Sequence, residues 1–148
     1  MSTTVTLTLS NAANDALEVV SRINLSPINA KLQYEDPVLW SDEAVAVAEV
    51  NYRRFLALHL MHPLATLVPN KILDEYWHHH ILDTRKYDAD CKTIFGSFLH
   101  HDPYFGIEGE EDRQMNIEAF TLTQQLWEEA FGLPLLGKSN PCSTTDCR

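Results

Sequence analysis

Apolar residues recur every three or four positions along four long stretches of the chain, which is the spacing of amphipathic helices. The first stretch begins at Ser10 or Asn11 and runs to about Ile23. Its apolar positions are Ala13, Leu17, Val20 and Ile23. Residues 1–9 alternate threonine with apolar residues, but no second stretch offers a strand to pair with. We therefore expect residues 1–9 to form a flexible arm.

The second long stretch follows two proline-containing breaks. The Ser-Pro pair at 26–27 predicts a stop or turn, and residues 28–34 are a short ambiguous piece that ends at Asp36, before a proline. Ser41 then caps a helix that runs to about Met61. The predicted buried face of this helix is Ala44, Val47, Ala48, Asn51, Phe55, Leu58 and His59.

The third stretch is predicted to be a helix with an internal break. Asn70 opens it, and Asp83 or Thr84 interrupts it and caps a continuation to Phe95. Gly96 is placed to end the continuation, because glycine accepts the left-handed conformation after a helix.

The last predicted helix runs from Glu110 to Phe131 and is closed by Gly132. Its expected apolar face is Met115, Ala119, Leu122, Leu126 and Ala130. The sequence thus predicts an all-α protein, a single compact domain of about four to six helices over residues 10–136. Residues 137–148 read as a flexible tail that contains two cysteines.

Composition narrows the functional classes. The chain has 148 residues and a formal net charge of −10, with 21 acidic residues against 11 basic ones. Because this field repels phosphates and no basic run occurs, nucleic-acid binding is disfavoured. No apolar run approaches the roughly 18 residues of a membrane span, and the start of the sequence lacks a signal-peptide pattern. We therefore expect no membrane partner and a cytoplasmic location.

The chemistry concentrates in residues 68–104, which hold five of the seven histidines. On a helix, residues four apart share a face, so Asp74 and His78 form one carboxylate–imidazole ladder. Glu75, His79 and Asp83 form another on the neighbouring face, where a solvated surface is the expected role. The three consecutive histidines therefore cannot all be directed at one ion.

A second segment must complete any site on this helix, and the loop at residues 100–102, His-His-Asp, is the natural candidate. Asp74, His78 and one histidine of the loop make a two-histidine, one-carboxylate set, which suits zinc or non-haem iron. His80 lies on a third side of the helix, which it shares with Tyr87 further along.

Other interpretations of the same residues stay open. The aspartate and histidines are also consistent with a buried structural network in a non-catalytic interaction module, or with acid–base chemistry without a metal. His59 and His62 are placed to serve the last carbonyls of their helix, and Cys91 has the spacing of a core thiol. Cys142 and Cys147 make the tail a candidate for binding a protein partner or a modifying enzyme.

Residues 41–106 resemble the conserved domain of glycine-rich-domain-containing proteins, in a short stand-alone form of the kind found in bacteria. The matching elements are YRRFL (Tyr52 to Leu56), D-x-x-W-H-x-H (Asp74, Trp77, His78, His80), Tyr87, Cys91, Phe95-Gly96 and the H-x-P of His101 and Pro103. This resemblance favours His78, His80 and His101 over His79 and His100, and it implies no particular reaction.

Together these observations favour a pocket lined by histidine and aspartate that binds a transition metal ion, and a metal-dependent enzyme is one class of protein that such a pocket fits. The predicted ligands are Asp74, His78 and His101. His80 is expected to act as an acid, a base or an outer support of the ligands, and Tyr87 as a hydrogen-bonding partner. The small-molecule substrate is not specified by the sequence.

Overall fold

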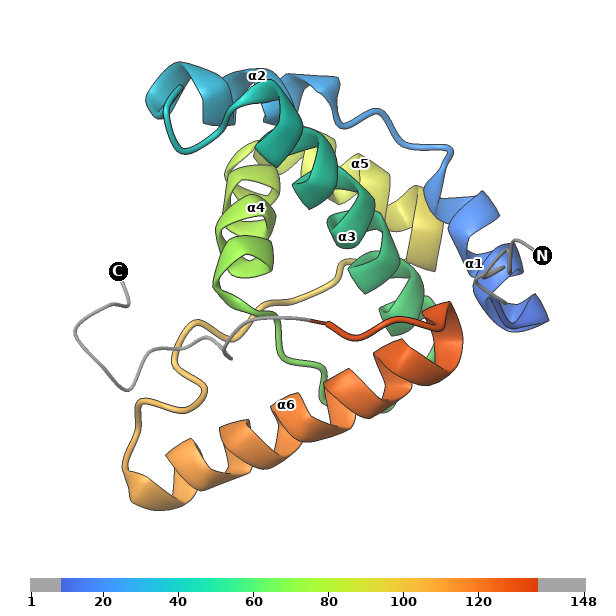
Figure 1. Ribbon diagram of the computed structural model, residues 1–148, viewed down its shortest axis with the longest axis vertical. Helices are drawn as coiled ribbons and strands as arrows, with labels where there is room; N and C mark the ends of the chain where they lie inside the picture. Colours follow the sequence, from blue (N-terminus) through green and yellow to red (C-terminus); the bar gives the residue numbers. More distant parts are fainter. Residues whose placement is uncertain (1–8, 136–148) are drawn as a thin grey trace, which may run out of the picture.

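The computed structural model describes residues 9–135, which contain six helices and no strand (Figure 1). This confirms the all-α prediction. The helices are α1 (Asn11–Val20), α2 (Ser26–Glu35), α3 (Asp42–Met61), α4 (Lys71–Leu82), α5 (Thr84–Phe95) and α6 (Glu110–Phe131). The predicted arm, apart from Leu9, and the predicted tail with Cys142 and Cys147 lie outside the described residues.

Helix ends were predictable wherever a local capping residue sets them. The side chains of Ser10, Ser41 and Asn70 each accept a hydrogen bond from the backbone N–H three residues further on. Each therefore satisfies one of the N–H groups that a helix start leaves without a partner. Gly96 and Gly132 follow α5 and α6 with φ of 75° and 74°, the left-handed conformation predicted for them.

The structure corrects the sequence analysis at α2 (Ser26–Glu35). A stop was predicted at the Ser-Pro pair, but a helix begins there. The helix begins at Ser26, with Pro27 in its first turn. Proline is tolerated there because the first N–H groups of a helix have no partner within the helix. Ile28 and Leu32 are buried and hold α2 against the core.

Helix α1 ends at Val20, one turn before the predicted end at Ile23. The guanidinium of Arg53, on α3, donates hydrogen bonds to the carbonyl oxygens of Val20 and Ile23 at 3.0 and 3.2 Å. The carbonyl oxygens of these two residues therefore receive hydrogen bonds from another helix. For this reason α1 needs no further turn to satisfy them.

Helix α3 is the centre of the domain and contacts α1, α2, α4 and α6 (Figure 1). Its second half is enclosed on several sides, since four successive residues, 55–58, are at most 1% exposed. The predicted buried face was correct for Ala48 and Phe55 but wrong for Val47, which is 56% exposed.

The buried face of α6 differs from the predicted one by one position. Met115 and Leu122 are exposed, whereas Asn116 and Thr123 are buried. The hydroxyl of Thr123 accepts a hydrogen bond from the backbone N–H of Val68 at 3.0 Å and so ties α6 to the loop before α4. The spacing of apolar residues does not reveal this face, because two of its residues are polar. They are buried where they form hydrogen bonds.

A buried polar network joins α3, α4 and α5. The hydroxyl of Tyr52 lies 2.7 Å from Nδ1 of His80, and Nε2 of His80 lies 2.8 Å from Oδ2 of Asp90. Lys86 also contacts that carboxylate oxygen, at 3.0 Å. Burial lowers the pKa of His80, although the hydrogen bond that its ring donates to Asp90 opposes the shift. A neutral ring therefore accepts from Tyr52 and donates to Asp90.

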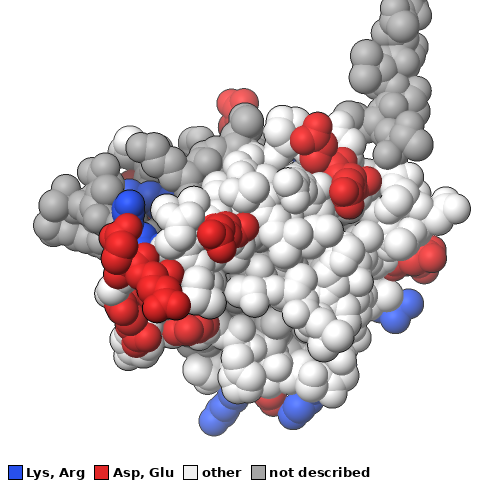
Figure 2. Space-filling view, turned by 90° about the horizontal axis from the view of Figure 1, so that it is seen from below, with Lys and Arg blue, Asp and Glu red and all other residues white. Residues whose placement is uncertain are grey.

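The surface of the domain is acidic at one end. Asp and Glu side chains gather on the left of Figure 2, the side on which α6 begins in Figure 1. The first turn of α6 contains Glu110, Glu111 and Asp112. Within residues 9–135, every helix is too short or too polar to cross a membrane.

Replacing His80 with alanine is expected to lower the free energy of unfolding by about 2–4 kcal/mol, because the change leaves Tyr52 and Asp90 without their shared partner inside the protein. Urea denaturation followed by circular dichroism measures the loss. His79→Ala is the matched control, because its bond to Glu35 lies at the surface and should contribute less than about 1 kcal/mol. Equal losses in the two variants would contradict the structural role of His80.

Candidate metal centre

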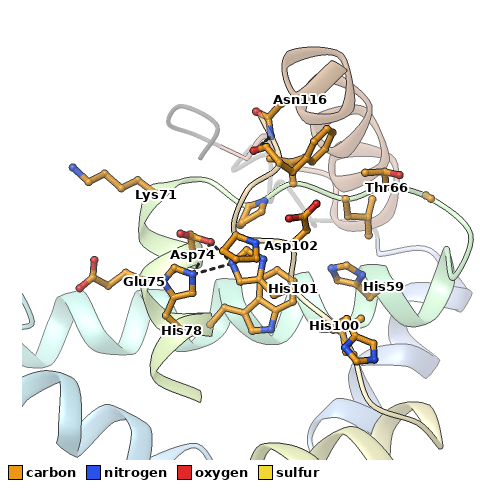
Figure 3. Close-up of a pocket in the computed structure, with 18 of the residues that line it drawn as sticks. His59, Thr66, Lys71, Asp74, Glu75, His78, His100, His101, Asp102 and Asn116 are labelled. Atoms are coloured by element: carbon orange, nitrogen blue, oxygen red, sulfur yellow. Dashed lines mark hydrogen bonds and ion pairs between the residues drawn. The ribbon is translucent and has the colours of Figure 1, made fainter. Parts of the chain in front are cut away.

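A cavity of about 530 Å³ opens where three segments of the chain meet. Its walls come from the start of α4, the loop before it and the loop between α5 and α6 (Figure 3). His59 from α3 and Asn116 from α6 complete the lining. The two loops are far apart in sequence, so the cavity exists only once the helices have packed.

Asp74, His78 and His101 meet on one wall of this cavity (Figure 3). The Nε2 atom of His101 lies 2.7 Å from Oδ1 of Asp74 and 2.9 Å from Nε2 of His78. The third side of the triangle, from His78 Nε2 to Asp74 Oδ1, measures 3.5 Å. The three residues that the sequence analysis selected as ligands are thus brought together.

A small cation can reach all three atoms. A single ion about 2.0–2.2 Å from each of the three atoms, the usual length of zinc–nitrogen and zinc–oxygen bonds, can touch all of them at once. The separations of 2.7 and 2.9 Å are also ordinary hydrogen-bond lengths, and they are shorter than the spacing of about 3.4 Å between ligand atoms around a tetrahedral zinc ion. One carboxylate and two imidazoles are also a donor set that zinc and iron accept.

Helix α4 supplies two of the three groups through its own geometry. Asp74 and His78 are one turn apart on the same face, as their spacing predicts. The side chain of Asp74 is 9% exposed and that of His78 is 46% exposed. The centre therefore has a buried carboxylate on one side and an open imidazole on the other, which leaves room for water or a substrate.

The third group reaches the centre because the loop of His101 is held from two sides. The ring of His101 stacks on Trp77 at 4.1 Å, with only 12° between the planes. Trp77 Nε1 donates a hydrogen bond to the hydroxyl of Tyr87 at 2.9 Å, and that hydroxyl donates to the carbonyl of Leu99. Tyr87 thus fixes both the ring beneath His101 and the backbone just before it.

Tyr87 and the other histidines of residues 78–100 lie outside the group of three. His80 is on the opposite side of α4, in the network with Tyr52 and Asp90, so the structure does not bring it to the cavity. Tyr87 supports the centre from behind, without lining the cavity. His79 lies 2.7 Å from a carboxylate oxygen of Glu35 on α2, where the sequence predicted only a solvated face. His100 is exposed and lines the cavity outside the group of three.

His59 is a cavity residue to which the sequence analysis gave another role. It was expected to serve carbonyls at the end of α3, but its ring packs edge-on against Phe55 and lines the cavity. Burial, with a smaller contribution from the charge of His101, lowers the pKa of His59 to about 4. The sequence feature that could have indicated a buried position for His59 was its place on the predicted buried face of α3.

The fold and the centre define an all-α domain with a candidate metal site at the wall of a cavity. The chain belongs to the UCP032817-like family, whose sequence model matches residues 17–127. This range covers α4 and the loop of His101, so the whole candidate centre lies within the family region. No curated protein and no solved structure matches the chain.

The family match corrects the resemblance inferred from the sequence. The assignment of residues 41–106 to the domain of glycine-rich-domain-containing proteins is wrong, because the match is to a different family and extends well beyond that range. The preference for His101 over His100, which rested on that resemblance, now rests on the 2.7 Å contact between His101 and Asp74.

The lowered pKa of His59 predicts a loss of stability in acid. The pKa is about 4 in the folded state and near 6.5 in the unfolded state, so only the unfolded chain gains a proton as the pH falls from 6.5 to 4. The free energy of unfolding should fall by on the order of 3 kcal/mol across this window from this group alone. Urea denaturation at several pH values tests this. In His59→Phe the free energy of unfolding should depend less steeply on pH. A dependence as steep as that of the wild type would contradict the lowered pKa of His59.

Proposed function

We propose that Asp74, His78 and His101 bind a divalent transition metal ion, zinc or iron, and that the protein is a metal-dependent enzyme acting on a small molecule. The observation that supports this most directly is the convergence of three ligand atoms, all within 4.8 Å of one another, at the wall of a cavity. The buried carboxylate of Asp74 adds support, because a cation beside it compensates for the loss of its hydration.

The residues around the centre suit catalysis better than a closed structural site. Structural zinc sites are filled by four protein ligands, whereas catalytic ones use three and keep a position open. Three protein groups converge here, and the open side faces the cavity. A bound ion would supply Lewis acidity or an activated water molecule at that position. Trp77 and Tyr87 would hold His101 in place while the substrate binds.

A metal-free structural network is the competing interpretation, and the short contact between His101 and Asp74 is what favours it. In that case one proton links the two side chains, and the three groups serve to fasten the loop to α4. The two interpretations differ in metal content, which can be measured directly.

Protein purified without a histidine tag is expected to contain about one zinc or iron ion per chain, measured by elemental analysis. His78→Ala, His101→Ala and Asp74→Asn should each lose most of the metal, because each removes one of three ligands. His100→Ala is the matched control: it removes a neighbouring histidine of the same cavity and should retain the metal. A folded wild-type protein that stays metal-free after exposure to equimolar zinc or iron would exclude the proposal.

Tyr87→Phe is expected to weaken metal binding by about 10- to 100-fold, because it removes the hydroxyl that holds Trp77 and the backbone before His101. Competition with a chelator of known affinity measures the change. Tyr76→Phe is the control: that buried hydroxyl donates to Asn29, away from the cavity, so metal affinity should not change. Equal effects of the two substitutions would show that Tyr87 has no particular role in positioning His101.

A further inference from the structure

Asn116, on α6, is a buried polar residue of the cavity that the candidate metal centre does not use. The residue is 3% exposed, so its side-chain amide is almost wholly removed from bulk solvent. Its Nδ2 donates to the carbonyl oxygen of Phe105 at 3.5 Å, a long contact. An amide oxygen has two lone pairs for hydrogen bonds, and within residues 9–135 Oδ1 of Asn116 accepts none.

That oxygen can be reached from the cavity. In the part of the chain that the structure describes, two side-chain polar atoms are both unpaired and fully enclosed, Nε2 of His59 and Nε1 of Trp127. Oδ1 of Asn116 is unpaired but is not one of them, so it keeps contact with the space that its residue lines. Because an unpaired polar group inside a protein costs free energy, a molecule that donates a hydrogen bond to this oxygen gains by binding there.

The cavity is large enough for such a molecule. Its volume of about 530 Å³ lies in the usual range for sites that bind small organic ligands, whereas a water molecule needs only about 30 Å³. Figure 3 shows Asn116 at the α6 end of the cavity, apart from Asp74, His78 and His101. Asn116 and the candidate metal centre therefore offer two separate points of attachment within one cavity.

Much of the remaining lining is apolar. Leu67 and Val68 come from the loop before α4, and Phe105 and Ile107 come from the loop before α6. Phe105 is also the residue whose carbonyl oxygen contacts the amide of Asn116. This surface suits an apolar body, because burying apolar groups against it removes them from water.

The formal charges of the cavity do not select the charge of the ligand once the proposed ion is counted. Asp74, Glu75 and Asp102 carry three negative charges, and Lys71 together with a divalent ion carries three positive ones. Recognition at the far end of the cavity therefore depends on shape and on hydrogen bonding. An amide oxygen selects a group that donates, a hydroxyl or an N–H, over one that only accepts.

We infer that the cavity binds a small molecule with an apolar body and a hydroxyl or N–H group, and that Oδ1 of Asn116 accepts the hydrogen bond of that group. The inference deepens the proposed function by naming a ligand class for the same cavity. It rests on the proposed function only for the part of the ligand that faces the metal ion. The contact with Asn116 does not require the ion.

Hexanol and its isomer methyl pentyl ether are the probes, because they contain the same atoms but only the alcohol donates a hydrogen bond. Nitrogen NMR of the side-chain amides follows each titration, and Asn116→Asp identifies the signal of Asn116 by its disappearance. Hexanol should shift this signal and bind about three- to tenfold more tightly than the ether, the usual effect of one hydrogen bond.

Asn116→Leu separates the hydrogen bond from general packing, because leucine has a similar shape but no acceptor. In this variant the two isomers should bind within about twofold of each other, and the affinity for the ether should change by no more than about twofold. Asn116→Asp keeps an acceptor oxygen and should keep the preference for hexanol. The shift of the amide signal in the wild-type protein tests the contact even if Asn116→Leu fails to fold.

The inference is overturned if neither isomer shifts the amide signal of Asn116, because Oδ1 then binds an internal water molecule only. Equal affinities of the two isomers for the wild-type protein, or a preference for hexanol that persists in Asn116→Leu, would overturn it as well. Elemental analysis of the same samples, with and without equimolar zinc or iron, separates the two proposals. Bound metal without the preference removes this inference alone, whereas the preference in protein that binds no metal removes the metal proposal alone.

Discussion

The hydroxyl of Tyr87 is the contact on which the candidate centre depends. It accepts the N–H of Trp77 and donates to the carbonyl of Leu99, so a single buried oxygen links α4 to the loop after α5. Trp77 then supports the ring of His101, which comes to lie 2.7 Å from Asp74. The centre therefore depends on α5, which contributes no ligand, as much as on the segments that carry the ligands.

Three consecutive histidines have three different roles in this protein. His78 faces the cavity, His79 pairs with a carboxylate of α2, and His80 lies within the core between Tyr52 and Asp90. Successive residues of a helix point about 100° apart, so identical side chains meet different surroundings. The histidine-rich appearance of the segment thus contains one candidate ligand, one surface contact and one structural group.

Much of the fold was predictable because it is set by local chemistry. The starts of α1, α3 and α4 and the ends at Gly96 and Gly132 depend on capping groups next to them in sequence. The break at Asp83 was predicted at the right place, but its side chain makes no capping hydrogen bond to α5. The buried face of α6 was not predictable in this way. Asn116 and Thr123 are buried because they contact the loops around the cavity. The spacing of apolar residues does not predict such contacts.

The sequence by itself determined that Asp74 and His78 share a face and that His80 cannot join them, because the helical repeat fixes both relations. Which histidine of the loop completes the group was decided by tertiary structure, through the stacking of His101 on Trp77. The place of His59 in the cavity was decided in the same way. Helical geometry acts over one or two turns, whereas contacts between distant segments depend on how all the helices pack.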